Sequence, residues 1–250
     1  SGIPSVKIDI NRKLFTNVPK DLNIRESIEQ LYAAILPSFQ EQVEKEIETC
    51  KKLGISIITY QDFNYPALLN QTEGKPPVLF AKGNLNLLEG LHLAVVGSRK
   101  SSLNSAAVTN KLVRELTELQ VVIVSGMALG IDAYAHKAAL NTGTIAFLGS
   151  GVNVVFPPQN KELYNQIVQK GLVLSAVPVN GEPVASNFPR RNNYIAGMSL
   201  GVLVIEAKLK SGSLITANSA INYGREVFAV PGNPNDPNSQ GCNKLIKYGA

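Results

Sequence analysis

The chain has 250 residues, of which 44% are hydrophobic, and its formal net charge is +5. This length suits one large domain, or one domain with a small appendage, and the apolar content is sufficient for a core. No apolar run approaches the roughly 20 residues of a membrane-spanning helix, nothing resembles a signal peptide, and two distant cysteines and two histidines offer no metal-ligand spacing. We therefore expect a cytoplasmic protein with reduced thiols, no membrane partner, no metal and no cofactor.

The positive charge is concentrated in the second part of the chain. Residues 1–89 contain 10 Lys and Arg against 11 Asp and Glu, giving −1, whereas residues 90–250 contain 14 against 8, giving +6. A basic domain suits a polyanionic partner, although a charge of this size is also ordinary for a soluble protein.

Residues 1–54 predict a small helical N-terminal segment. Arg25–Leu36 is a candidate helix, and Ser38–Leu53 is a clearer one, because Ser38 and Glu41 form a capping box and Gly54 follows its last turn. We place the domain boundary here, with one domain over residues 55–250. Its first elements are two expected strands and a turn of helix: Ile55–Thr59, Val78–Ala81 and Leu85–Leu88.

From residue 91 onward, short β-rich runs alternate with helical patterns. The runs show no polar alternation, so we expect strands that are buried on both faces and covered by helices on both sides. This predicts an α/β fold with a doubly wound, mostly parallel sheet. The expected strands are Leu91–Val96, Val121–Val124, Thr144–Leu148, Leu172–Leu174, Val202–Ile205 and Glu226–Val230. The expected helices are Ser101–Leu119, Ile131–Asn141, Gln159–Gln169, Arg190–Ser199 and Leu214–Tyr223.

Glycine-rich loops follow several of these strands, at the edge where doubly wound sheets bind ligands. The strand that ends at Val96 opens through Gly97 onto a helix N-terminus, whose unpaired N–H groups and dipole favour a phosphate. Arg99 adds a guanidinium that can pair with phosphate oxygens. The candidate binding residues in these loops are Gly97, Ser98, Arg99, Lys100, Ser125, Gly126, Gly130, Gly149, Gly151, Lys208, Ser211, Gly212 and Ser213. The set indicates a phosphate-bearing ligand, yet neither a GxGxxG after the first strand nor a Walker A loop is present.

A second basic segment follows Pro189. Arg190, Arg191 and Asn192 stand at an expected helix start, where cations oppose the helix dipole unless an anion lies between them. We therefore favour a binding role for this segment over a merely solvated helix N-terminus.

Several other residues have structural alternatives. Asp132 and His136, four apart on one helix, could be acid–base partners, but a structural pair or a helix cap is favoured. Glu206 could pair with Arg190 or Arg191. Ser213 is most simply an N-cap, and Lys208 with Lys210 could be exposed loop charges only.

With these residues in view, the chain resembles the DNA-processing protein A family, also called DprA or Smf. The matching stretches include VVGSR at 95–99, SGMALGIDAYAH at 125–136, GSGVNVVFPPQN at 149–160, NFPRRNNYIAG at 187–197 and EAKLKSGSLITA at 206–217. The resemblance covers residues 55–250 in order. It implies an extended Rossmann-like fold that binds and protects single-stranded DNA without catalysis. It also implies loading of the RecA recombinase during natural transformation, with homodimers as the working form.

The resemblance also implies which residues of this chain contact DNA. The family's DNA-binding arginine corresponds to Arg99, with Gly97 as the turn glycine. Where some members have a lysine this chain has Pro158, and Lys161 nearby is the expected substitute. The family's Arg-Asn-Arg reads Arg191-Asn192-Asn193, so one cation is lost. Many members continue into a small winged-helix domain, which we expect to be absent from this chain or removed from it.

Two other functions remain open from sequence. One is a sensor that binds a free nucleotide at the same edge. The other is a nucleotide phosphoribohydrolase, an enzyme that needs a carboxylate beside the sugar. The stretch most similar to the signature of such enzymes is SGSLIT at 211–216, and it lacks the Glu that should follow. We predict a single-stranded-DNA-binding protein with no catalytic residue.

Overall fold

The computed structural model describes residues 39–250, and residues 48–250 form one compact unit. The candidate helix Arg25–Leu36 and the capping serine Ser38 lie outside the described residues. Residues 39–53 are helical, as the sequence predicts. Gly54 follows with a φ of +63°, a left-handed conformation that glycine adopts without steric cost.

An eight-stranded sheet forms the middle layer, in the order β1-β2-β6-β5-β4-β3-β7-β8. Strands β3 to β8 pair in parallel, and β2 joins β6 and β1 in antiparallel fashion at one edge. The α/β fold with a doubly wound, mostly parallel sheet is thereby confirmed. The strands are β1 Ser56–Thr59, β2 Val78–Gly83, β3 Leu91–Val96, β4 Val121–Ser125, β5 Thr144–Leu148, β6 Leu172–Ser175, β7 Gly201–Val204 and β8 Glu226–Ala229.

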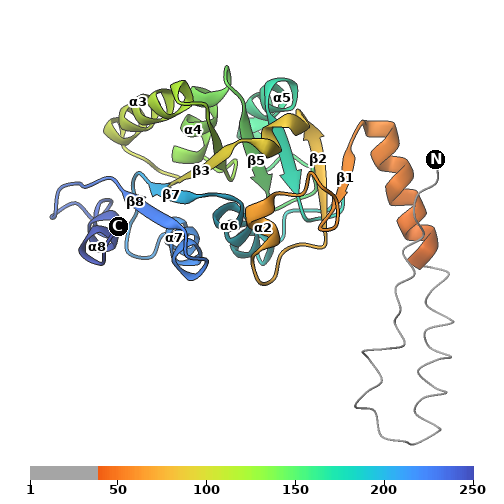
Figure 1. Ribbon diagram of the computed structural model, residues 1–250. Coiled ribbons are helices and arrows are strands. Elements are labelled where there is room, and N and C mark those ends of the chain that lie inside the picture. Colours follow the sequence, from red (N-terminus) through yellow and green to blue (C-terminus); the bar gives the residue numbers. More distant parts are fainter. Residues whose placement is uncertain (1–38) are drawn as a thin grey trace, which may run out of the picture. The chain divides into compact units, whose positions relative to one another are not determined.

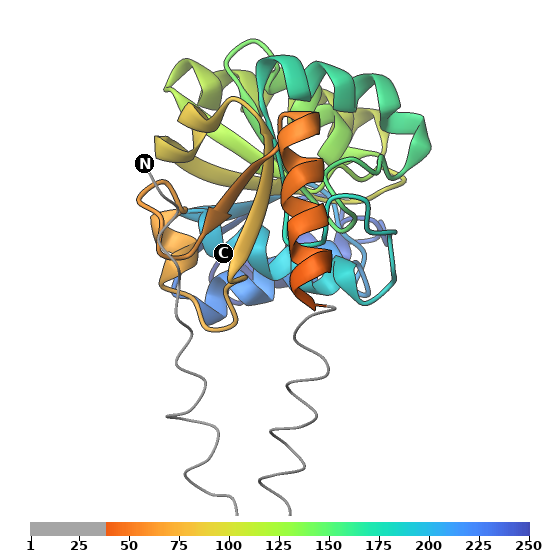
Figure 2. The ribbon, with the colours of Figure 1, turned by 90° about the vertical axis from the view of Figure 1, so that its right-hand side faces the viewer.

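Helices cover both faces of this sheet. Helices α3, α4 and α5 pack side by side on one face, while α2, α6 and α7 pack on the other (Figures 1 and 2). Helix α8 packs against β8, and neither α8 nor α2 was expected from the sequence. The α-helices are α2 Ala67–Asn70, α3 Leu103–Glu118, α4 Ile131–Ala139, α5 Lys161–Lys170, α6 Asn187–Met198, α7 Ser213–Asn222 and α8 Gln240–Lys247, with 3₁₀ turns at Leu85–Glu89 and Pro158–Asn160.

The central strands contribute alternate residues to hydrophobic clusters on the two faces of the sheet. In β3, Val95 packs with Val113 and Ile131 of α3 and α4, whereas Ala94 and Val96 belong to the core that α6 and α7 cover. Side chains of a strand alternate between the two faces. Both faces are apolar here, which explains why the strand sequences show no polar alternation.

The winding of the chain reverses next to β3. From β3 the chain passes through α3 to β4 on one side, and it later returns through α6 to β7 on the other side. The loops that follow β3 and β7 therefore diverge toward opposite faces, and they leave a crevice at the carboxyl ends of these two strands.

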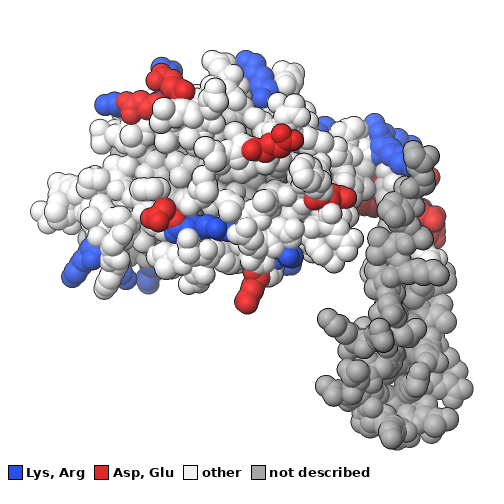
Figure 3. Space-filling model, viewed as in Figure 1, with Lys and Arg blue, Asp and Glu red and all other residues white. Residues whose placement is uncertain are grey.

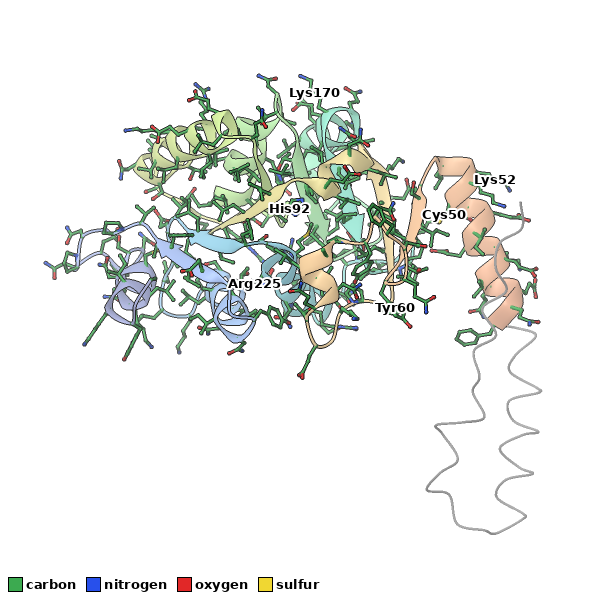
Figure 4. The ribbon with its side chains drawn as sticks, in the orientation of Figure 1. Cys50, Lys52, Tyr60, His92, Lys170 and Arg225 are labelled. Atoms are coloured by element: carbon green, nitrogen blue, oxygen red, sulfur yellow. The ribbon has the colours of Figure 1, made fainter. Side chains whose placement is uncertain are left out.

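Two polar residues labelled in Figure 4 have structural contacts away from this crevice. Arg225, just before β8, donates from Nη2 to the Leu68 carbonyl of α2 at 3.1 Å. His92 of β3 hydrogen-bonds through Nε2 to the Leu87 carbonyl at 2.7 Å. Among the described residues, no helix is both long enough and apolar enough to cross a bilayer.

Candidate nucleic-acid interface

A cavity of about 560 Å³ opens at the crevice between the ends of β3 and β7, and we call it the first cavity. It brings together much of the predicted set, from loops more than 100 residues apart in sequence. Predicted residues that line it are Gly97, Ser98, Arg99, Lys100, Arg191, Asn192, Lys208, Ser211, Gly212 and Ser213. Lys210 and Asp132 line it as well.

The turn that carries Arg99 is fixed from two sides. The Ser98 N–H donates to the Glu206 carbonyl at 2.8 Å, and the Ser98 carbonyl accepts from Ile131 N–H at 3.2 Å. A Cβ atom on Gly97 would lie 2.7 Å from the Ile131 side chain and 3.1 Å from the Glu206 carbonyl, so only glycine fits. The turn holds the Arg99 side chain exposed at the mouth of the cavity.

The N-terminus of α3 is already occupied by a protein carboxylate. Glu206 Oε2 accepts from the Ser102 N–H at 3.1 Å and from the Ser105 hydroxyl at 2.8 Å. This corrects two expectations: Glu206 does not pair with Arg190 or Arg191, and the start of this helix is not bare, because the Ser102 N–H binds Glu206 and the Ser105 N–H binds the Ser102 hydroxyl at 3.1 Å. The first cavity therefore presents cationic side chains, and not a free helix N-terminus, as its groups suited to an anion.

The loop after β7 supplies the opposite wall. Lys208 and Lys210 are exposed on it, and α8 supports it from behind through the Gly241 N–H, which donates to the Ala207 carbonyl at 2.8 Å. Helix α7 begins at Ser213, whose hydroxyl bonds the Ser211 hydroxyl at 2.7 Å and caps no helical N–H. The expectation that Ser213 is the N-cap of this helix is therefore wrong.

Arg191 supports the floor of the site and is only 5% exposed. Its guanidinium donates from Nη1 to the Gly126 carbonyl, and to the Phe147 carbonyl at 2.9 Å, so it joins α6 to the ends of β4 and β5. A Cβ atom on Gly126 would lie 2.0 Å from this Nη1, which explains the glycine. Burial lowers the pKa of Arg191 to about 10, although the carboxylate of Asp132 opposes the shift.

Asp132 is the buried counter-charge beneath the site. Its carboxylate accepts from the Gly126 N–H at 3.1 Å and from the Ala128 N–H at 3.2 Å. Burial raises its pKa, while the charge of Arg191, these two N–H groups and the charge of Arg99 act in the opposite direction. Asp132 thus fixes the loop after β4, and it is neither the partner of His136 nor the N-cap of α4, which corrects the two structural roles that the sequence favoured.

His136 does not pair with Asp132. Its Nδ1 lies 2.9 Å from the Thr144 hydroxyl, which itself donates to the Ile123 carbonyl at 2.6 Å, so Nδ1 carries the proton. Nε2 is buried and has no hydrogen-bond partner in the part of the chain that the structure describes. Burial, with a contribution from the charge of Arg191, lowers the pKa of His136 to about 3.

A second cavity, of about 310 Å³, adjoins the first and shares Arg99 and Arg191 with it. Its wall includes Phe156, 41% exposed, whose ring centroid lies 5.5 Å from that of Phe188. Phe156 was not predicted from the sequence as a residue of the site, because only the tertiary packing brings the loop after β5 next to the start of α6.

Asn160 was missed for a similar reason. Its side-chain amide donates to the Met127 carbonyl at 2.8 Å and to the Ala128 carbonyl at 3.2 Å, and so it ties the glycine loop after β4 to the start of α5. Met127 has a φ of +62°, which the sequence does not predict because residues other than glycine rarely adopt a positive φ.

The remaining predicted residues have other positions. Ser125 is fully buried and its hydroxyl donates to the Val95 carbonyl at 2.6 Å, which corrects its expected ligand contact. Gly149 and Gly151 are buried where a Cβ would meet Phe188 and the Pro178 carbonyl, respectively. Gly130 lies against the Ser98 carbonyl, Lys161 is exposed at the start of α5, and Arg190 lines a third cavity.

Cationic side chains on the broad face of the molecule do not gather. On the face shown in Figure 3, the described Lys and Arg side chains lie singly or beside acidic ones. The carboxyl edge differs, because the exposed cations Arg99, Lys100, Lys208 and Lys210 line one cavity there.

A family model described as "DNA recombination-mediator protein A" matches residues 56–250. The chain belongs to this family. The DNA processing protein DprA of Streptococcus pneumoniae is 47% identical over 188 residues, covering 74% of this chain and 66% of that protein. Protein Smf of Synechocystis is 43% identical over 210 residues, covering 82% of this chain and 53% of that protein. The chain thus spans about half to two thirds of the length of these relatives.

Two solved structures of family members have the same fold. The X-ray structure of DprA from Streptococcus pneumoniae matches with a TM-score of 0.76 and 45% identity, over 78% of this chain and 70% of that one. A structure of DprA from Helicobacter pylori, described by its single-stranded DNA binding mode, matches with a TM-score of 0.73 and 32% identity, over 78% of this chain and 88% of that one. The family and the extended Rossmann-like fold that the sequence resemblance implied are thereby confirmed.

Proposed function

We propose that this chain binds single-stranded DNA at the carboxyl edge of its sheet, with the first cavity as the main contact. The observation that carries the proposal is the exposed Arg99 at the mouth shared by two adjoining cavities, opposite Lys208 and Lys210. Single-strand binders combine such cations along the phosphates with surfaces on which bases rest. The H. pylori relative, whose structure is described by its binding of single-stranded DNA, supports the same ligand.

The chemistry of the cavity favours binding over catalysis. Of the described residues that line the first cavity, Asp132 carries the carboxylate, and this group is buried and accepts two backbone N–H groups. A glycosidic bond cleaved by a phosphoribohydrolase needs a carboxylate that can reach the sugar. We therefore propose that the protein is not an enzyme.

The wider role follows from the family. We propose that the protein protects single-stranded DNA in the cytoplasm and helps to load the RecA recombinase during natural transformation. We also propose a homodimer, in which two sites on one strand add avidity. Light scattering at micromolar concentration tests the dimer, and RecA filament assembly on DNA coated with a single-strand-binding protein tests loading.

Fluorescence anisotropy with single- and double-stranded oligonucleotides across a salt series tests DNA binding. Arg99→Ala is expected to weaken single-strand binding by about 1–3 kcal/mol and to reduce the salt slope by about one unit, with an unchanged melting temperature because Arg99 is exposed. Arg114→Ala is the matched control, because Arg114 is exposed on the second half of α3, which runs away from the carboxyl edge. Equal affinity of the two variants would contradict the assignment of Arg99.

A free nucleotide is the competing ligand for the first cavity. A mononucleotide that displaces a labelled oligonucleotide at micromolar concentration would favour the sensor. If a mononucleotide displaces the oligonucleotide only at millimolar concentration, single-stranded DNA is the favoured ligand, because a strand contacts several cations and a mononucleotide contacts few.

A further inference from the structure

A third cavity, of about 270 Å³, lies on the same edge of the sheet but beside different strands. Its wall includes Leu148, the last residue of β5, and Ala176, the residue after β6. The first cavity lies between the ends of β7 and β3. In the sheet order, three strand spacings separate the two positions, or about 14 Å at the usual spacing of neighbouring strands.

The third cavity has the chemistry of an anion site with an apolar wall. Arg190 is exposed at its rim and forms no ion pair with any described residue. Its charge lies in the first turn of α6, where the helix dipole disfavours a cation and an anionic ligand would offset that cost. Pro178 and Val177 supply an apolar surface beside it, and the residues that line the cavity include no carboxylate.

Arg191 connects this cavity to the other two. It lines all three cavities, it is 95% buried, and its Nε has no hydrogen-bond partner among the described residues. The buried carboxylate of Asp132 opposes the charge of Arg191, but Asp132 lines the first cavity only, so Arg191 lines the second and third cavities without a carboxylate beside it. The edge therefore forms a row of three cavities that share the Arg191 side chain, with exposed cations at its two ends.

We propose that the third cavity is a further nucleotide subsite for the strand held at the first cavity. The strand then runs along the carboxyl edge from β7 and β3 to β5 and β6, with a phosphate on Arg190 and the sugar or base against Pro178 and Val177. At the stacked rise of about 3.4 Å per nucleotide, the separation of about 14 Å corresponds to about four nucleotides. This inference rests on the proposed function.

The test measures affinity against oligonucleotide length. Thymidine oligomers of 2, 4, 6 and 12 nucleotides compete for the protein with a labelled 20-mer at low salt. We expect Arg190→Ala to bind the dinucleotide with an affinity within twofold of the wild type. For oligomers of six or more nucleotides, we expect its affinity to be about five- to tenfold lower than that of the wild type. Arg99→Ala is expected to have a lower affinity for oligomers of every length. Arg190→Lys is expected to keep its affinities within twofold of the wild type, and Arg114→Ala is expected to lose affinity at no length.

Each outcome decides the proposal. If Arg190→Ala behaves like Arg114→Ala at every length, the third cavity holds no nucleotide, while the proposed function stands on the Arg99 result. If Arg190→Ala weakens the dinucleotide as much as the 12-mer, the two cavities do not form one path and the inference fails. If the wild-type protein binds no oligomer, the proposed function fails and the inference fails with it.

Discussion

Two neighbouring arginines on α6 predict opposite phenotypes. Arg191 is buried and donates to two carbonyls at the ends of β4 and β5, whereas Arg190 is exposed on the same helix. Arg191→Ala removes both hydrogen bonds and leaves Asp132 as a buried charge without its counter-charge. Breaking a buried charge arrangement of this kind costs about 3–5 kcal/mol, out of a typical total of roughly 5–15 kcal/mol.

The matching measurement is urea unfolding followed by circular dichroism, with thermal unfolding in parallel. For a domain of this size, about 3–5 kcal/mol corresponds to a fall in melting temperature of roughly 6–20 °C. Arg190→Ala is the control, with the same residue type on the same helix, and we expect a change within about 0.5 kcal/mol. An Arg191→Ala variant as stable as Arg190→Ala would refute the structural role of the buried guanidinium.

Three further substitutions test the supports of the site. Gly130→Ala would place its Cβ 2.2 Å from the Ser98 carbonyl at a φ of +74°. We expect the free energy of unfolding to fall by about 2–4 kcal/mol and DNA binding to weaken, and an unchanged urea midpoint would contradict this. Glu206→Ala removes two acceptor contacts at the start of α3 and should cost about 1–2 kcal/mol by the same assay, whereas no loss would show that the cap is dispensable. His136 stays neutral in the folded chain down to about pH 3 but gains a proton near pH 6.5 when unfolded, so the wild type loses stability as the pH falls. Between pH 7 and 4.5, the wild type should lose about 2–3 kcal/mol more than His136→Gln, and parallel declines would exclude His136 as the cause.

The sequence alone determined the layered α/β fold and the edge of the sheet at which the first and second cavities open. Apolar runs without alternation can be buried only between two layers of helices, and this pattern is local and survives any detail of packing. The Arg99 turn was likewise predictable, because a buried strand that ends in glycine before a helix exposes its next side chains at the carboxyl edge.

Which charged residues are exposed at the cavities and which are buried beneath them follows from tertiary packing and could not be predicted from the sequence. Sequence placed Arg190 and Arg191 together, yet one is exposed and the other is buried beneath three cavities, because a helix turns by about 100° per residue and only one of them faces the sheet. Glu206 and Ser102 are more than 100 residues apart, so nothing local could show that the helix start expected to hold a phosphate already holds a carboxylate. The distinction between a contact residue and a supporting residue depends on burial and on long-range hydrogen bonds, and both arise only when distant segments pack.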